Sequence, residues 1–184
     1  PAAVAGLEFL RELHVSGLVA PESLEWDSVA SGEAFAAGGA AMMVNWSGYA
    51  AMCPPGSVAC GQVPAGVSLN IYWVLVMATG CVQPANAYAY LQHVASPEMD
   101  LITTLEGANG VRLSTWRDPR AQALSPAYEV MEEVHRGVLS PPPVEAWPGV
   151  SEVLSRAIAE VVRGRMGARE ALERASARIS EAGW

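Results

Sequence analysis

Three cysteines are the first residues in this sequence whose chemistry needs an explanation. Cys53 and Cys60 flank the turn-rich stretch CPPGSVAC, and Cys81 stands apart from them. One interpretation is a local disulfide between Cys53 and Cys60 in an oxidising compartment, and the other is three small buried thiols. A thiol hydrolase that pairs Cys60 or Cys81 with His93 is a further hypothesis. It lacks support, because no cationic group stands beside either thiol in the sequence.

Motifs for metal, phosphate or acid–base chemistry are not found. The cysteines form no CxxC pair, and His14, His93 and His135 fall on separate expected helices without HExxH spacing. Glu132 and Glu133 are helical neighbours that point about 100° apart, so they do not face one site. No glycine-rich phosphate loop or nucleophile elbow occurs. We therefore expect no cofactor, no metal and no catalytic activity.

Composition excludes several classes of protein. The 184 residues carry a formal charge of −8, which disfavours a nucleic-acid binder, and an apolar fraction of 51% excludes a disordered chain. The longest apolar run, Ile71–Ala78, is too short for a membrane span, which needs about 20 residues. The sequence begins at Pro1 without a charged-then-apolar leader, so we expect a mature chain, a trimmed one or a fragment.

Apolar periodicity, Ser-Pro helix starts and terminal glycines predict about seven helices. They cover residues 2–16, 29–37, 87–94, 97–107, 126–137, 150–162 and 168–179. Compact apolar runs predict strands at Ala40–Val44 and Ile71–Ala78, the second of which is rich in β-branched and aromatic residues. We expect loop at 53–68, extended or irregular backbone at 109–116, and a crossing segment at the proline run 141–143. So few strands do not close a sheet, and we infer that the sheet partners lie outside this chain.

Four stretches occur in an order and at a spacing that resemble a known family. They are EAFAAGGAAMMVNWSGYA (Glu33–Ala50), IYWVLVMATG with NAYAYLQHVASPEM (Ile71–Met99), GANGVRLSTWRDP (Gly107–Pro119) and the helical tail Val150–Ile179. Together they resemble the C-terminal half of bacterial extracellular solute-binding proteins, the carbohydrate-binding family that includes maltose-binding protein. The Cys-flanked stretch Pro54–Pro64 and the Asn109–Gly110 pair depart from the family pattern.

The resemblance implies an α/β fold of the type II periplasmic-binding-protein class, present in incomplete form. Residues 1–69 would form the first part of the C-terminal lobe, and residues 111–184 its second part. Residues 70–110 would be a crossing segment that includes part of the N-terminal lobe. The rest of that N-terminal lobe, missing from this sequence, would then be a partner from the same protein.

The resemblance also implies a set of ligand-binding residues. They are Asn45, Trp46, Tyr72, Trp73, Asn109, Gly110, Arg112, Trp116 and Trp147. Aromatic rings cover the C–H face of a pyranose, and planar amide and guanidinium groups pair with its hydroxyls. Each residue has a structural alternative: Asn45 caps a turn, Arg112 belongs to a hinge, and Trp147 packs on the next helix. Tyr72 and Trp73 point to opposite faces of their strand, where burial in a sheet is the alternative.

The function implied is that of the substrate-binding component of an ABC importer. A sugar or oligosaccharide would bind in the cleft between the lobes, and hinge closure would present it to the permease subunits. The location implied is extracellular or periplasmic, with a lipoprotein anchor whose signal lies outside these residues. The alternatives are the thiol hydrolase and a helical interaction module.

Overall fold

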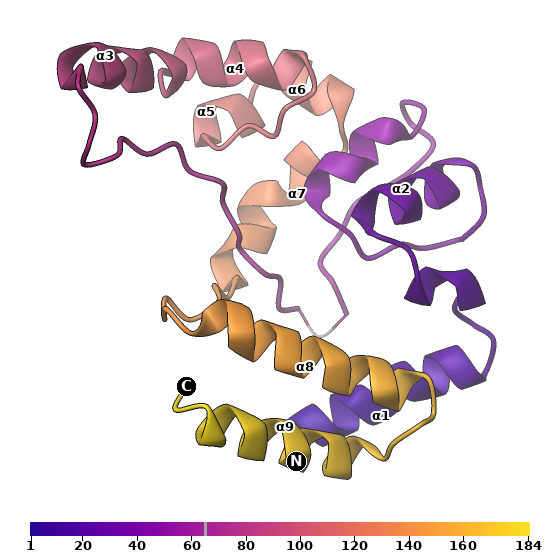
Figure 1. Cartoon of the computed structure of the whole chain (residues 1–184). Helices are drawn as coiled ribbons and strands as arrows, with labels where there is room; N and C mark the ends of the chain where they lie inside the picture. The colour runs from indigo at the N-terminus through magenta and orange to yellow at the C-terminus, as the bar shows by residue number, and fades with distance from the viewer. Residues whose placement is uncertain (65) are drawn as a thin grey trace. The chain divides into compact units, whose positions relative to one another are not determined.

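Helices account for almost all regular structure in the computed structural model, which describes residues 1–64 and 66–184 (Figure 1). The α-helices are α1 (Ala2–Val15), α2 (Ser28–Ala36), α3 (Pro84–Val94), α4 (Pro97–Leu105), α5 (Leu113–Trp116), α6 (Pro119–Leu124), α7 (Ala127–Val134), α8 (Trp147–Val162) and α9 (Ala168–Glu181). Three 3₁₀ turns are η1 (Pro21–Leu24), η2 (Ser47–Met52) and η3 (His135–Gly137). The chain divides into two compact units, residues 1–27 with 141–184 (unit 1) and residues 28–140 (unit 2). Both predicted segment boundaries, at residues 69 and 110, fall inside unit 2.

The predicted helices are confirmed where capping residues, prolines or glycines define their ends. Ser96 caps α4 by accepting a hydrogen bond from the amide of Met99 at 3.2 Å, and a proline occupies the first position of that helix. Gly107, with φ of 102°, follows its C-terminal end in the left-handed region that favours glycine. The short helix α5 lies where extended or irregular backbone was expected, and α6 lies in a stretch for which no element was predicted.

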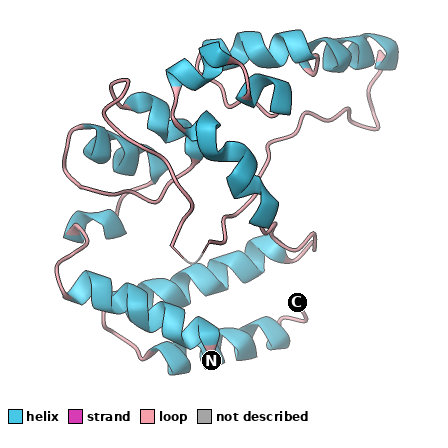
Figure 2. Cartoon of the chain, turned by 180° about the vertical axis from the view of Figure 1, so that it is seen from behind, coloured by secondary structure: helices cyan, strands magenta, loops and turns pink. Residues whose placement is uncertain are grey.

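The predicted α/β fold is wrong. In the part of the chain that the structure describes, no sheet forms, and the two predicted strands are loops or extended backbone (Figure 2). The β-pairing present there is one isolated parallel bridge between Leu69 and Leu139. Its hydrogen bonds run from the Asn70 amide to the Leu139 carbonyl at 2.8 Å and from the Leu139 amide to the Ser68 carbonyl at 2.9 Å. The next step needs an N–H from residue 141, which is a proline, so the ladder ends there.

Unit 1 is built on three helices, α1, α8 and α9. Its buried core contains Leu7 of α1, Val161 of α8, and the alanines 168 and 171 of α9. Small alanine side chains let the helix backbones approach closely, while Leu7 and Val161 fill the space between them. An ion pair of 2.6 Å joins Glu25 to Arg163 at the end of α8.

A buried polar network in unit 2 joins α4, α5 and α7 to the loop at 106–112. The buried Asp100 carboxylate of α4 accepts one hydrogen bond from the Val111 amide at 3.1 Å and another from the Thr115 hydroxyl at 2.5 Å. The hydroxyl of Thr104 donates to the Asp100 carbonyl at 2.6 Å. Each carboxylate oxygen therefore has a donor, which a buried charge requires. We refer to these residues, with Gly110, Trp116 and Tyr128, as the Asp100 network.

Gly110 occupies the most crowded position of this network. The Trp116 indole donates to the Gly110 carbonyl at 2.6 Å, and the Gly110 amide donates to the Tyr128 hydroxyl at 3.1 Å. A Cβ atom at Gly110 would lie 2.6 Å from the Thr115 methyl and 2.7 Å from the Thr104 hydroxyl. Both neighbours are buried, so neither has room to withdraw.

Substituting Gly110→Ala should therefore destabilise unit 2, by about 1–3 kcal/mol. The measurement is the free energy of unfolding from urea denaturation followed by tryptophan fluorescence. The matched control is Gly61→Ala, at an exposed glycine whose added Cβ would meet nothing within 4 Å. Equal unfolding free energies for the two variants would contradict the packing described here.

Candidate ligand-binding hollow in unit 2

A hollow of about 310 Å³ lies beside the Asp100 network, entirely within unit 2. The end of α4 and the loop after it form one wall, η2 contributes a second, and the junction of α6 and α7 a third. Residues that define it are Gly48, Ala51, Leu105, Glu106, Asn109 and Leu124. We call it the Asn109 hollow. Its volume is at the lower end of the range for small-molecule sites in proteins, roughly 300–1,000 Å³.

Asn109 offers an unused amide at this hollow. Its side chain is exposed, and no hydrogen bond ties it to another described residue. The amide lies against Gly48 so closely that a Cβ on Gly48 would be 2.9 Å from Nδ2 and 3.2 Å from Oδ1. The Glu106 carboxylate, also exposed, likewise makes no hydrogen bond within the described residues. Asn109 therefore presents a free donor and a free acceptor at the hollow, and Glu106 presents a free acceptor.

The other polar groups around the hollow are already hydrogen-bonded. Thr104 donates to the Asp100 carbonyl, and the Ser125 hydroxyl accepts from the Ala127 amide at 3.3 Å. The Tyr128 hydroxyl accepts from Gly110 and donates to the Ala108 carbonyl at 3.3 Å. These bonds hold the loop that carries Asn109 in one conformation before any ligand arrives.

The predicted site residues in the first loop have local roles. Asn45 donates from Nδ2 to the Ser28 carbonyl at 2.9 Å, and its Oδ1 accepts from the Trp46 amide at 2.8 Å. Its amide is thus used in the turn. Trp46 precedes η2 and keeps 46% of its surface exposed, so its ring remains accessible two residues before Gly48.

Gly110 and Trp116 are both buried in the Asp100 network, where they fix the backbone on which Asn109 stands. The Arg112 guanidinium donates to the Ala95 carbonyl at the end of α3. Trp147 begins α8 and belongs to unit 1.

Tyr72 reaches the same network through a histidine. Its hydroxyl lies 3.1 Å from His135 Nε2, and the His135 ring packs on Trp116 with ring centroids 4.6 Å apart. Its neighbour Trp73 is fully exposed. Of the nine predicted residues, the structure therefore gathers Asn109, Gly110 and Trp116 around one loop, with Tyr72 attached through His135.

Sequence analysis missed three residues that matter here. Asp100 and Tyr128 hold the loop, and Glu106 adds the second free polar group of the hollow. Asp100 and Thr104 are one helical turn apart, but helical spacing alone does not reveal that Val111 and Thr115 fold back onto them.

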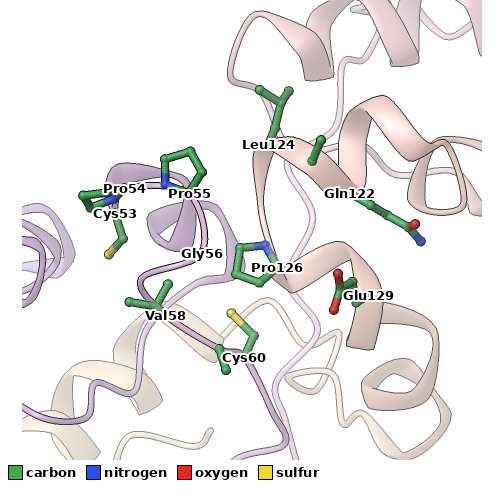
Figure 3. A pocket seen from close by; sticks show the side chains of 12 residues that line it. Cys53, Pro54, Pro55, Gly56, Val58, Cys60, Gln122, Leu124, Pro126 and Glu129 are labelled. Carbon is green, nitrogen blue, oxygen red and sulfur yellow. The ribbon is translucent and has the colours of Figure 1, made fainter.

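A second hollow, of about 260 Å³, contains the two cysteines Cys53 and Cys60 (Figure 3). Both are free thiols on the two arms of the loop that carries Pro54 and Pro55. Burial raises the pKa of the Cys60 thiol above its ordinary value, and the nearby Cys53 and the Glu129 carboxylate raise it further. A raised pKa keeps the thiol protonated near neutral pH and lowers its nucleophilicity, which is unfavourable for a thiol hydrolase.

Comparison of the chain with protein-family models, with curated proteins and with solved structures finds no match. The resemblance to the C-terminal half of solute-binding proteins is therefore wrong as an identification, since the helical architecture also differs from the mixed α/β fold of that family. The quoted stretches consist of helix starts, small-residue turns and apolar runs. Such signals report local backbone preferences and do not specify how distant segments pair.

The described residues also bear on membrane and metal binding. Within residues 1–64 and 66–184, no helix combines the length and apolar character that crossing a bilayer needs. The same residues contain no cluster of three or more His, Cys, Asp or Glu side chains arranged to hold a metal ion.

The cause of the raised Cys60 pKa predicts how its reactivity depends on pH. Replacing Glu129→Gln removes a negative charge that opposes the thiolate, so the pKa should fall and alkylation of Cys60 at pH 8 should be faster. Iodoacetamide labelling read by peptide mass spectrometry distinguishes Cys60 from Cys53 and Cys81. Glu133→Gln, an exposed glutamate of the same helix, is the control. An unchanged Cys60 rate in Glu129→Gln would show that the carboxylate does not act on the thiol.

Proposed function

We propose that unit 2 binds a small carbohydrate in the Asn109 hollow. The observation that carries the proposal is the free amide of Asn109, held against Gly48 at the wall of a hollow of about 310 Å³. An exposed asparagine with no partner in the described chain offers both a donor and an acceptor to a ligand.

The chemistry of the hollow suits a polyhydroxylated ligand. A sugar hydroxyl is at once a donor and an acceptor, and it matches the Asn109 amide on both counts. The Glu106 carboxylate accepts hydrogen bonds from further hydroxyls, and charge-assisted bonds of this kind are stronger than neutral ones. Apolar side chains of Ala51, Leu105 and Leu124 offer a surface to the C–H face of the ring.

Trp46, in the segment that leads into η2, is an aromatic candidate near the hollow in sequence. Trp46 stands two residues before Gly48, and about half of its surface is exposed. Aromatic rings stack on the apolar face of a pyranose. The size of the hollow favours a monosaccharide or one terminal unit of a longer sugar.

The rigidity of the loop that carries Asn109 lowers the entropic cost of binding a ligand. The Asp100 network fixes the backbone on both sides of Asn109 through the bonds at Ala108, Gly110 and Val111. A group that is already ordered loses little conformational entropy when it binds a ligand.

This proposal keeps the carbohydrate ligand predicted from the sequence and moves its site. The ligand would bind within one compact unit, and no closure between two lobes is required. Delivery to an ABC importer, the permease partner and an extracellular lipoprotein location stay predictions. The lack of catalytic activity also stays a prediction.

Isothermal titration calorimetry with a panel of monosaccharides and disaccharides tests the proposal. Asn109→Ala removes two hydrogen-bonding groups and should weaken the best ligand about tenfold. Asn86→Ala is the matched control, because Asn86 lies on α3, does not line the hollow, and bonds only its neighbour Gln83 at 2.7 Å.

Gly48→Ala probes the same amide without removing it. The new methyl would press on the Asn109 amide and displace it by a few tenths of an ångström, so affinity should fall while the protein remains folded. Absence of binding by every sugar at millimolar concentration, or equal affinities for Asn109→Ala and Asn86→Ala, would refute a carbohydrate site in this hollow.

A further inference from the structure

Among the described residues that line the Asn109 hollow, Glu106 alone carries a charge near neutral pH. Its exposed carboxylate forms no hydrogen bond or ion pair with another described residue. No arginine or histidine lines the hollow within residues 1–64 and 66–184, and the sequence contains no lysine. A ligand in the hollow therefore meets a negative charge that this part of the chain leaves without a counter-charge.

The arginines of unit 2 do not supply that counter-charge. Arg117 forms an ion pair with Glu132 at 2.7 Å, and Arg120 forms one with Asp118 at 2.9 Å. The other arginines of the unit do not line the hollow either. The charge that a ligand meets there is therefore that of the Glu106 carboxylate.

The end of helix α4 adds partial negative charge at the same place. The helix ends at Leu105, and Glu106 is the next residue. The last carbonyl groups of a helix lack helical partners and carry a partial negative charge. Within the described chain, the carbonyls of Leu105 and Glu106 accept no hydrogen bond. The helix end and the carboxylate therefore act in the same sense on a charged ligand.

Helix α7 begins at the hollow, and the N-terminal end of a helix carries charge of the opposite sign. Its first amides are already hydrogen-bonded. Ala127 donates to the Ser125 hydroxyl at 3.3 Å, and Tyr128 donates to the Ser125 carbonyl at 3.2 Å. Glu129, in the first turn, donates from its amide to the Pro126 carbonyl at 3.3 Å, and its carboxylate offsets the positive end of the helix. These amides are therefore not available to an anionic ligand.

We propose that Glu106 makes the Asn109 hollow select sugars by their charge. An amino sugar binds best, the neutral sugar of the same ring binds less tightly, and the sugar acid binds least tightly. This inference rests on the proposed function, because it concerns the same hollow. The Asn109 amide pairs with a hydroxyl of the ring, and the Glu106 carboxylate accepts a charge-assisted hydrogen bond from the ammonium group.

The exposure of Glu106 sets the size of the effect. Water and salt screen an exposed carboxylate, so an ion pair with it contributes only modestly to affinity. We therefore expect each step in the order, from amino sugar to neutral sugar to sugar acid, to be about threefold to fivefold in dissociation constant.

Isothermal titration calorimetry with matched sugars tests the selection. The probes are glucose, glucosamine and glucuronate, with the corresponding galactose series, near pH 6, where the amine is protonated and the acid is ionised. In the wild-type chain at low ionic strength, the amino sugar should bind more tightly than the neutral sugar of its series, and the sugar acid less tightly. Added salt should reduce both differences, because it screens the Glu106 charge.

Glu106→Gln isolates the charge, because it keeps the size of the side chain and an oxygen acceptor. The three sugars of a series should then bind within about twofold of one another, while the affinity for the neutral sugar changes little. Glu133→Gln is the matched control. Glu133 is an exposed glutamate of the same unit that does not line the hollow, and its replacement changes the net charge by the same amount. This control should keep the wild-type order.

Three results would overturn the selection by charge. The first is equal binding of the three sugars of a series by the wild-type chain, and the second is a sugar acid that binds most tightly. The third is an order that persists in Glu106→Gln or disappears equally in Glu133→Gln. If the neutral sugar still binds and Asn109→Ala weakens it, any of these results leaves the proposed function standing. Absence of binding by all of these sugars refutes the selection together with the sugar site itself.

Discussion

The buried carboxylate of Asp100 is the interaction on which the structure around the hollow depends. Removing a charged group from water costs several kcal/mol, and only well-placed donors recover that cost. The Val111 amide and the Thr115 hydroxyl supply those donors from a loop and a helix that follow α4 in the chain. Because the carboxylate needs both of them, α4, α5 and the intervening loop are joined together. The backbone that carries Asn109 is held by that constraint.

The helices could be predicted because short stretches of sequence mark where they start and end. The hollow could be predicted only in part, because few such signals mark the residues that form it. A helix start depends on residues within one turn, as at Ser96 and Met99, and such a contact can be read from a short stretch of sequence. Asn109 was a candidate because planar amides suit hydroxyl ligands. Its support through Tyr128, 19 residues further along, depends on chain folding that no local pattern encodes.

The predicted strands show the limit of local preference most clearly. Ile71–Met77 is rich in the β-branched and aromatic residues that favour strands, but a strand exists only where a second segment supplies hydrogen bonds. Within the described chain, Leu139 pairs with Ser68 and Asn70, which precede this segment. Pro141 lacks the N–H that the next step of the ladder would need. The strand predicted at Ile71–Ala78 was therefore wrong, because a strand depends on a partner segment as well as on local preference.

Tyr72 is connected to the residues behind the Asn109 hollow through His135. Its Nδ1 lies 2.9 Å from the Met131 carbonyl, which can only accept, so Nδ1 carries a proton. In the neutral ring Nε2 is then an acceptor for the Tyr72 hydroxyl. The ring also packs on Trp116, whose indole holds the loop that carries Asn109. Tyr72 is thus tied to the Asp100 network through His135, whereas the next residue, Trp73, is fully exposed.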